Sequence, residues 1–141
     1  MLRLLVLIAW SQTCHIDGGL PDPGCTPGEV TNVPLKTLCH SPAEEHATEK
    51  MKFLVTQLYA TREGEQVEID HLVPLNLGGA NTLINLWPQP AEPTPGYKEK
   101  NELEDLLHRM VCRGQMNLAY AQHEIARDWV ALFYKLFPFV P

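Results

Sequence analysis

Asp70 and His71 place an acid and an imidazole side by side, and Asn85 follows fourteen residues after the histidine. These residue types can together hydrolyse a phosphodiester bond. A carboxylate binds a divalent cation, a neutral histidine activates water, and an amide holds the histidine. A histidine with its ordinary pKa of about 6.5 suits the role of general base at neutral pH.

The residues around this pair predict how the chain must bend to use it. Neighbouring residues of a regular strand point to opposite faces, so Asp70 and His71 can serve one site only where a strand ends. Pro74 and the pair Gly78-Gly79 follow and indicate a loop. Asn85 could equally be a structural amide that ties this loop to the strands, and Trp87 is expected in the core rather than as a platform for stacking bases.

The elements that position these residues can be predicted from periodicity. Alternating residues predict a strand over 67–71 and a second over 82–87, which would form an antiparallel hairpin. Four prolines between 88 and 95 would keep the next segment extended, and a helix is expected over 97–112, ended by Gly114.

Two further helices are expected on either side of this unit. Ser41 is a suitable N-cap, with Pro42 at the first helical position and Glu44 completing a capping box. The apolar face of that helix would comprise Ala47, Met51, Leu54 and Leu58. Asn117 would cap the last helix. The order helix, strand, strand, helix, helix predicts an α+β fold built on a ββα unit.

The N-terminal part divides into two segments. Residues 1–13 combine Arg3 with a short apolar run, which is typical of a secretory signal; a buried N-terminal strand or helical turn is the alternative. The run is too short to span a bilayer. Residues 14–40 are rich in Pro and Gly and indicate an irregular arm, which leaves 41–141 as the main domain.

The chain has four cysteines, Cys14, Cys25, Cys39 and Cys112. None forms a Cys-x-x-Cys pair, so a zinc knuckle is not indicated. An even number beside an export signal favours two disulfides over four reduced cysteines. Three pairings are open; the expected pairing is Cys39–Cys112, with Cys14–Cys25 fastening the arm.

The motif from Asp70 to Trp87 resembles the HNH endonuclease motif, the ββα-metal finger. The resemblance implies that Asp70 binds a metal, His71 is the general base and Asn85 orients it. Flanking segments, such as 25–28, 37–39, 100–112 and 119–129, resemble small exported bacterial HNH-like proteins.

The third metal ligand departs from the pattern of this family. The family usually places a histidine or asparagine early in the helix after the second strand, but residues 91–100 contain neither. Asn101 and Glu104, three residues apart on one helix face, are the nearest candidates. An amide or carboxylate oxygen with several waters suits Mg²⁺, with Mn²⁺ as the alternative cation.

The net charge of −6 and a pI near 5.4 argue against tight, charge-driven binding to nucleic acid. They do not exclude DNA cleavage, because a bound cation supplies positive charge at the phosphate. No segment resembles a base-reading module. The sequence thus predicts an exported, cation-dependent DNA endonuclease of low sequence specificity; a degenerate, disulfide-stabilised HNH-like binding module is the alternative. It indicates no membrane association and no obligate protein partner; an immunity protein stays open, with no segment that indicates one.

Overall fold

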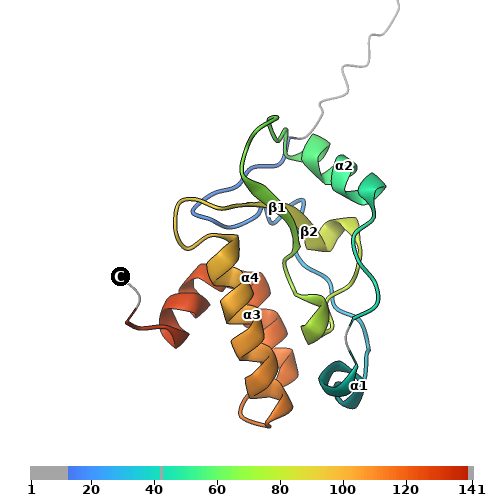
Figure 1. Ribbon diagram of the computed structural model, residues 1–141, viewed down its shortest axis with the longest axis vertical. Helices are drawn as coiled ribbons and strands as arrows, with labels where there is room; N and C mark the ends of the chain where they lie inside the picture. The colour runs from blue at the N-terminus through green and yellow to red at the C-terminus, as the bar shows by residue number, and fades with distance from the viewer. Residues whose placement is uncertain (1–12, 42, 140–141) are drawn as a thin grey trace, which may run out of the picture.

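The computed structural model describes residues 13–41 and 43–139, which form an α+β fold (Figure 1). The predicted signal segment therefore lies outside the described residues, except for Thr13. The elements in chain order are α1 (Leu35–His40), α2 (Glu49–Leu58), β1 (Val67–His71), β2 (Leu86–Pro90), α3 (Tyr97–Cys112) and α4 (Leu118–Leu136). Figure 1 shows the two strands between α2 on one side and the pair α3–α4 on the other. No helix in the described part is both long and apolar enough to cross a membrane.

The strands form an antiparallel hairpin in which Asp70 pairs with Trp87 and His71 with Leu86. The bounds of β1 agree with the prediction, but β2 begins four residues later than predicted. Residues 83–85 form a 3-10 turn instead of strand, and Pro88 and Pro90 lie within β2. Prolines are tolerated there because both strands of a two-stranded sheet are edge strands.

Two glycines shape the loop between the strands. Gly78 adopts the left-handed conformation, with a φ of 80°, at the end of a 3-10 turn. At Gly79 a Cβ atom would lie 1.8 Å from the carbonyl oxygen of Val73, so only glycine fits. The predicted glycine turn is therefore required by the close approach of two backbone segments.

The predicted helix start at Ser41 is wrong. Ser41 follows α1, and its N–H donates to the carbonyl of Thr37. The helix starts at Glu49, where the hydroxyl of Thr48 accepts from the N–H of Met51 at 3.2 Å. Ser41 and Thr48 are both suitable N-caps by residue type. Ser41 is instead the C-cap of α1, a helix that the sequence did not predict.

The buried face of α2 agrees with the prediction only in part: Met51 and the preceding Ala47 pack against the core as predicted. Leu54 and Leu58 are 37% and 42% exposed, whereas Val55 and Tyr59 are buried. The Tyr59 hydroxyl lies 2.7 Å from Thr26 Oγ1 and accepts from the N–H of Asp22. These contacts with the N-terminal arm turn the helix so that its C-terminal half buries Val55 and Tyr59, each one residue after a predicted position.

Both predicted disulfides are present in the structure. Cys39–Cys112 links α1 to the end of α3, and Cys14–Cys25 closes a loop within the arm. Cys14 is buried in the core, and its N–H donates to the carbonyl of Leu58. The arm is thus packed against the rest of the domain.

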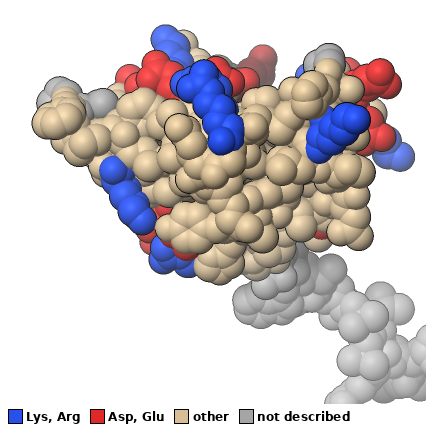
Figure 2. All heavy atoms as spheres, turned by 90° about the horizontal axis from the view of Figure 1, so that it is seen from below, with Lys and Arg blue, Asp and Glu red and all other residues tan. Residues whose placement is uncertain are grey.

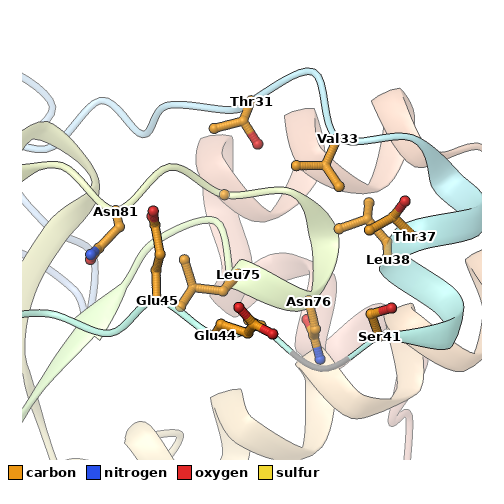
Figure 3. Close-up of a pocket in the computed structure, with 12 residues that line it drawn as sticks. Thr31, Val33, Thr37, Leu38, Ser41, Glu44, Glu45, Leu75, Asn76 and Asn81 are labelled. Atoms are coloured by element: carbon orange, nitrogen blue, oxygen red, sulfur yellow. The ribbon is translucent and has the colours of Figure 1, made fainter.

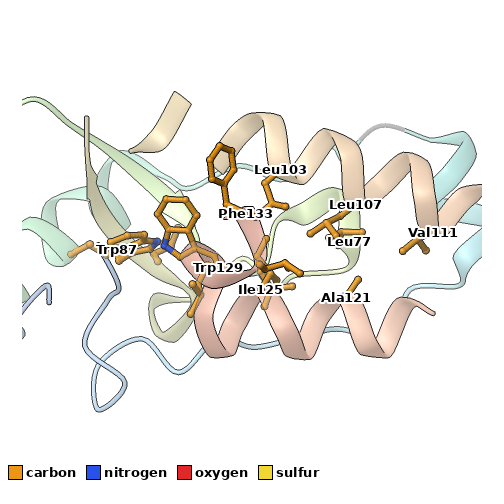
Figure 4. Close-up of a cluster of buried hydrophobic side chains, with 14 of the residues drawn as sticks. Leu77, Trp87, Leu103, Leu107, Val111, Ala121, Ile125, Trp129 and Phe133 are labelled. Carbon is orange, nitrogen blue, oxygen red and sulfur yellow. The ribbon is translucent and has the colours of Figure 1, made fainter. Parts of the chain in front are cut away.

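The core lies between the hairpin loop and the helix pair α3–α4 (Figure 4). The structure confirms the predicted bounds of α3 and the Asn117 cap of α4, whose side chain accepts from the N–H of Tyr120. Helix α4 has a kink at Asp128, whose carboxylate accepts from the N–H of Ala131. Buried core side chains include Leu77, Trp87, Leu103, Leu107, Ile125, Trp129 and Phe133. Trp87 is fully buried, so its expected core position is confirmed.

Candidate active site

Asp70 and His71 lie at the end of β1, where the hairpin loop begins. Their side chains meet different partners: Asp70 accepts from Lys100 on α3, whereas the His71 ring contacts Asn81 in the loop. Lys100 joins the two positions, because its ammonium also donates to the backbone carbonyl of His71 at 2.9 Å.

Asn81 fixes both the orientation and the tautomer of His71. Its Nδ2 donates to the carbonyl of His46, so its Oδ1 faces His71 Nε2 at 3.0 Å. An amide oxygen only accepts, so Nε2 carries the hydrogen and donates. The lone pair on Nδ1 then remains, and among the described residues Nδ1 has no hydrogen-bond partner. This nitrogen could accept a proton from water.

The His71 imidazole is neutral at pH 7. Burial lowers its pKa below the ordinary value, while Asn81 and Asp70 oppose this shift in part. The charge of Lys100 and the neighbouring His46 add to the lowering of this pKa. A neutral imidazole is the form that a general base requires.

Among the described residues the Asn85 side chain makes no hydrogen bond to His71, so this amide acts on the loop and not directly on the imidazole. Its amide is fully buried and bonds only to backbone: Nδ2 donates to the carbonyls of Val73 and Ala80, and Oδ1 accepts from Val73 N–H at 3.0 Å. Asn85 therefore holds the hairpin loop closed, which is the structural alternative considered above.

The predicted metal ligands Asp70 and Glu104 converge, but they do so on an amine. Lys100 is fully buried, and its Nζ lies 2.6 Å from Asp70 Oδ2 and also bonds to Glu104 Oε1. Both carboxylates are 13% exposed. The point where these oxygens meet already holds a positive charge.

The charges of this cluster affect one another. Burial opposes the charge on Lys100, but Asp70 and Glu104 outweigh it, so the pKa of Lys100 lies above its ordinary value. Burial raises the pKa of Glu104 to about 7, with Lys100 opposing and Asp70 adding to the shift. Glu104 is thus protonated in part of the molecules at neutral pH.

Asn101 does not join this group. It faces the carboxylate of Glu68. Burial and the charge of Asp70 raise the pKa of Glu68, and the hydrogen bond from the Asn101 amide opposes this shift in part. Carboxylate oxygens suit Mg²⁺, but Asp70, Asn101 and Glu104 do not converge on one open position while Lys100 lies between the carboxylates. The predicted ligand set therefore does not fit a divalent ion in this arrangement.

A groove of about 540 Å³ reaches Asn81 from the side of α1 (Figure 3). Its walls come from the arm before α1, from α1, from the segment that follows it and from the hairpin loop, and apolar and hydroxyl side chains dominate them. Glu44 and Glu45 also line it, and their charges oppose the approach of a phosphate. The groove gives access to the residue that holds His71.

The face shown in Figure 2 carries no continuous basic patch: its Lys and Arg side chains stand apart, with wide uncharged areas between them. This agrees with the excess of acidic residues, 17 against 11 basic ones.

Sequence reasoning missed two residues of this site. Lys100 shares the spacing of the buried positions Leu103, Leu107 and Val111 of α3, and this periodicity could have identified it as a buried cation. Asn81 has no comparable signal, because its role depends on the path of the loop. No family model, curated protein or solved structure matches this chain.

Proposed function

We propose that this protein is an HNH-type endonuclease that hydrolyses phosphodiester bonds of DNA with low sequence specificity. The observation that carries the proposal is His71 at the end of β1: it is neutral, held at Nε2 by Asn81, and free at Nδ1 of partners among the described residues. The order β1, β2, α3 around this histidine also supports the resemblance to the ββα finger.

The residues of the chain would divide the work in a simple way. His71 Nδ1 takes a proton from the attacking water, and Asn81 keeps the ring oriented while it does so. Asp70 stabilises the imidazolium that forms, because its negative charge favours protonated His71. Asn85 holds the loop that carries Asn81.

A divalent cation, Mg²⁺ or Mn²⁺, remains part of the proposal through the resemblance alone. Because Lys100 holds Asp70 and Glu104, such an ion requires either that Lys100 withdraws or that other ligands take part. Export is likewise proposed: two disulfides, one between distant segments, suit an oxidising compartment.

The second candidate is the degenerate HNH-like binding module, and Lys100 is the observation that favours it. A buried ammonium neutralises the carboxylates that would otherwise attract a cation. In this case the fold would persist without hydrolysis.

A plasmid-cleavage assay separates the two. Purified protein is incubated with supercoiled DNA and Mg²⁺ or Mn²⁺, with a chelator as control. His71→Ala should lower the rate by ~10²- to 10⁴-fold, the usual cost of losing a general base, without changing circular dichroism or Tm. His123→Ala is the matched control, since this histidine is exposed on α4. Cleavage by His71→Ala at the wild-type rate would refute the mechanism, and an inactive wild type with either metal would support the binding module.

A further inference from the structure

The disulfide Cys39–Cys112 has an imidazole beside it that the proposed nuclease does not use. Cys112 Sγ lies 3.6 Å from His108 Nε2, and one ligand atom from each of Cys39, His108 and Cys112 lies within 4.8 Å of the others. His108 and Cys39 are half-buried and Cys112 is exposed, so solvent reaches the group.

Two elements supply these residues at a spacing that suits a metal. His108 and Cys112 are one turn apart on α3, and Cys39 lies in the last turn of α1. Two thiolates and one imidazole, with water as the fourth ligand, are a common donor set for tetrahedral Zn²⁺. Zn–S and Zn–N bonds of about 2.3 and 2.0–2.1 Å at the tetrahedral angle place sulfur and nitrogen roughly 3.6 Å apart. The observed distance of 3.6 Å between Cys112 Sγ and His108 Nε2 matches this sulfur–nitrogen separation.

We propose that Cys39, His108 and Cys112 form a Zn²⁺ site when the disulfide is reduced. A dithiol reductant transfers two electrons and two protons to the bridge, becomes a disulfide itself, and leaves two thiols. Zn²⁺ then replaces the two thiol protons and binds both thiolates and the neutral imidazole. The sulfurs separate to about 3.8 Å in such a site, which rotation of the two side chains can provide.

To bind the metal, His108 must exchange its hydrogen bond to a backbone carbonyl for a bond to Zn²⁺. His108 Nε2 now donates to the carbonyl of Leu38 at 2.8 Å, so it must lose that hydrogen to bind Zn²⁺ through the same nitrogen. The metal would replace this contact between α3 and α1 and also the disulfide. Reduced protein with Zn²⁺ therefore keeps α1 attached to α3.

The other disulfide provides an internal control. Cys14 and Cys25 have no third His, Cys, Asp or Glu ligand at metal-binding distance among the described residues. Reduction of that pair should create no comparable site, although the chemistry of the bond is the same.

The test measures metal binding directly and does not depend on nuclease activity. The full chain is reduced anaerobically with a phosphine, which takes oxygen from water and leaves two thiols per bridge, and the phosphine is removed. Co²⁺ is then titrated as a spectroscopic substitute for Zn²⁺, and Zn²⁺ is added to displace it. We expect one Co²⁺ per chain with thiolate-to-cobalt absorption, unchanged in the Cys14→Ser/Cys25→Ser variant and absent from the oxidised protein.

Variants of His108 distinguish ligation from structural support. His108→Ala should weaken Co²⁺ binding at least tenfold, and His108→Cys should restore it with stronger thiolate absorption. Circular dichroism of the oxidised variants checks folding, since the disulfide holds them together. Absence of thiolate–metal absorption in the reduced Cys14→Ser/Cys25→Ser protein, or equal affinity in wild type and His108→Ala, would overturn the proposal.

Discussion

At the scale of single residues, two asparagines and one lysine determine how the candidate site is built. Asn81 and Asn85 are close in sequence but do different work: one bonds to the His71 ring and the other only to backbone. Lys100 is the ion-pair partner of two acidic groups, Asp70 and Glu104. Burial and the side chains next to His71 together hold its pKa below the ordinary value.

Alanine substitutions at the two asparagines should affect different properties: stability at Asn85 and the cleavage rate at Asn81. Asn85→Ala leaves the buried N–H of Val73 and two buried carbonyls without partners, and we expect a loss of about 2–4 kcal/mol in unfolding free energy. Asn81→Ala should cost less than about 1 kcal/mol, since Asn81 is partly exposed. It should instead slow DNA cleavage by roughly 10- to 100-fold, because the imidazole loses its orientation.

The pH profile gives a second readout for Asn81. The acid limb of the wild-type rate should lie below pH 6.5, because the pKa of His71 is lowered. In Asn81→Ala it should move further down, since the lost hydrogen bond favours protonated His71. Denaturant titrations and rate measurements between pH 5 and 8 check both asparagines; a rate loss in Asn81→Ala explained entirely by unfolding would contradict this assignment.

Lys100 should control how stability depends on pH. The pKa of Glu104 rises from 4.5 to about 7 on folding, so the folded state holds a proton that the unfolded chain releases in this interval. The contribution of Glu104 to stability is therefore full at low pH and falls as pH rises from about 4.5 to 7. Lys100→Met leaves two buried carboxylates unpaired and should cost about 3–5 kcal/mol at pH 8, and less at pH 5 where Glu104 is protonated.

Lys98→Met is the matched control, because Lys98 is exposed on the same helix. Its unfolding free energy should stay within about 0.5 kcal/mol of wild type at both pH values. Equal losses for Lys100→Met at pH 5 and pH 8 would contradict the assigned ionisation of the cluster.

At the scale of elements, the hairpin and α3 form the frame, and α1 and the arm are fastened to it. Helix α1 has six residues, too few to be stable alone, and Cys39 anchors it to α3. The arm packs on α2 through Cys14, Thr26 and Asp22. Covalent links thus stabilise the segments with the least secondary structure.

The two disulfides should differ in their effect on stability. Their sequence separations are 73 and 11 residues, and the chain-entropy model gives about 4.4 kcal/mol for Cys39–Cys112 and about 2.8 kcal/mol for Cys14–Cys25. We expect Cys39→Ser/Cys112→Ser to lower the unfolding free energy more than Cys14→Ser/Cys25→Ser does. Denaturant unfolding in metal-free buffer measures both, and the reverse order would show that local packing of Cys14 outweighs loop entropy.

At the scale of the whole molecule, acidic charge limits how the protein can meet DNA. The net charge is −6, and the face in Figure 2 has only separated basic side chains. Few phosphates can be neutralised by such a surface, so contact with DNA should be brief and local.

We therefore expect weak DNA binding even if cleavage occurs. The His71→Ala protein should bind a fluorescent duplex with a Kd of about 10⁻⁵ M or weaker at 0.15 M salt, in the range of non-specific binding. Anisotropy titrations at several salt concentrations measure the affinity and its slope. A submicromolar Kd with a steep salt dependence would reveal a basic surface that the charge count does not suggest.

The sequence by itself determined the parts that depend on local signals. The bounds of β1 and α3, the cap at Asn117, the glycine turn and the buried Trp87 follow from periodicity and turn chemistry, which act over a few residues. The disulfide pairing was one of three options, and the fold brings the expected partners together.

Only the tertiary structure decided which of two equivalent local signals is used. Ser41 and Thr48 are both good N-caps, and the fastening of α1 to α3 leaves Thr48 to begin α2. In the same way, Asn81 rather than Asn85 reaches His71 because the loop path places it there. Lys100 lies between the two carboxylates predicted to bind the cation because folding buries an amine between residues from different elements. Such long-range contacts depend on how elements pack, and no short stretch of sequence contains that information.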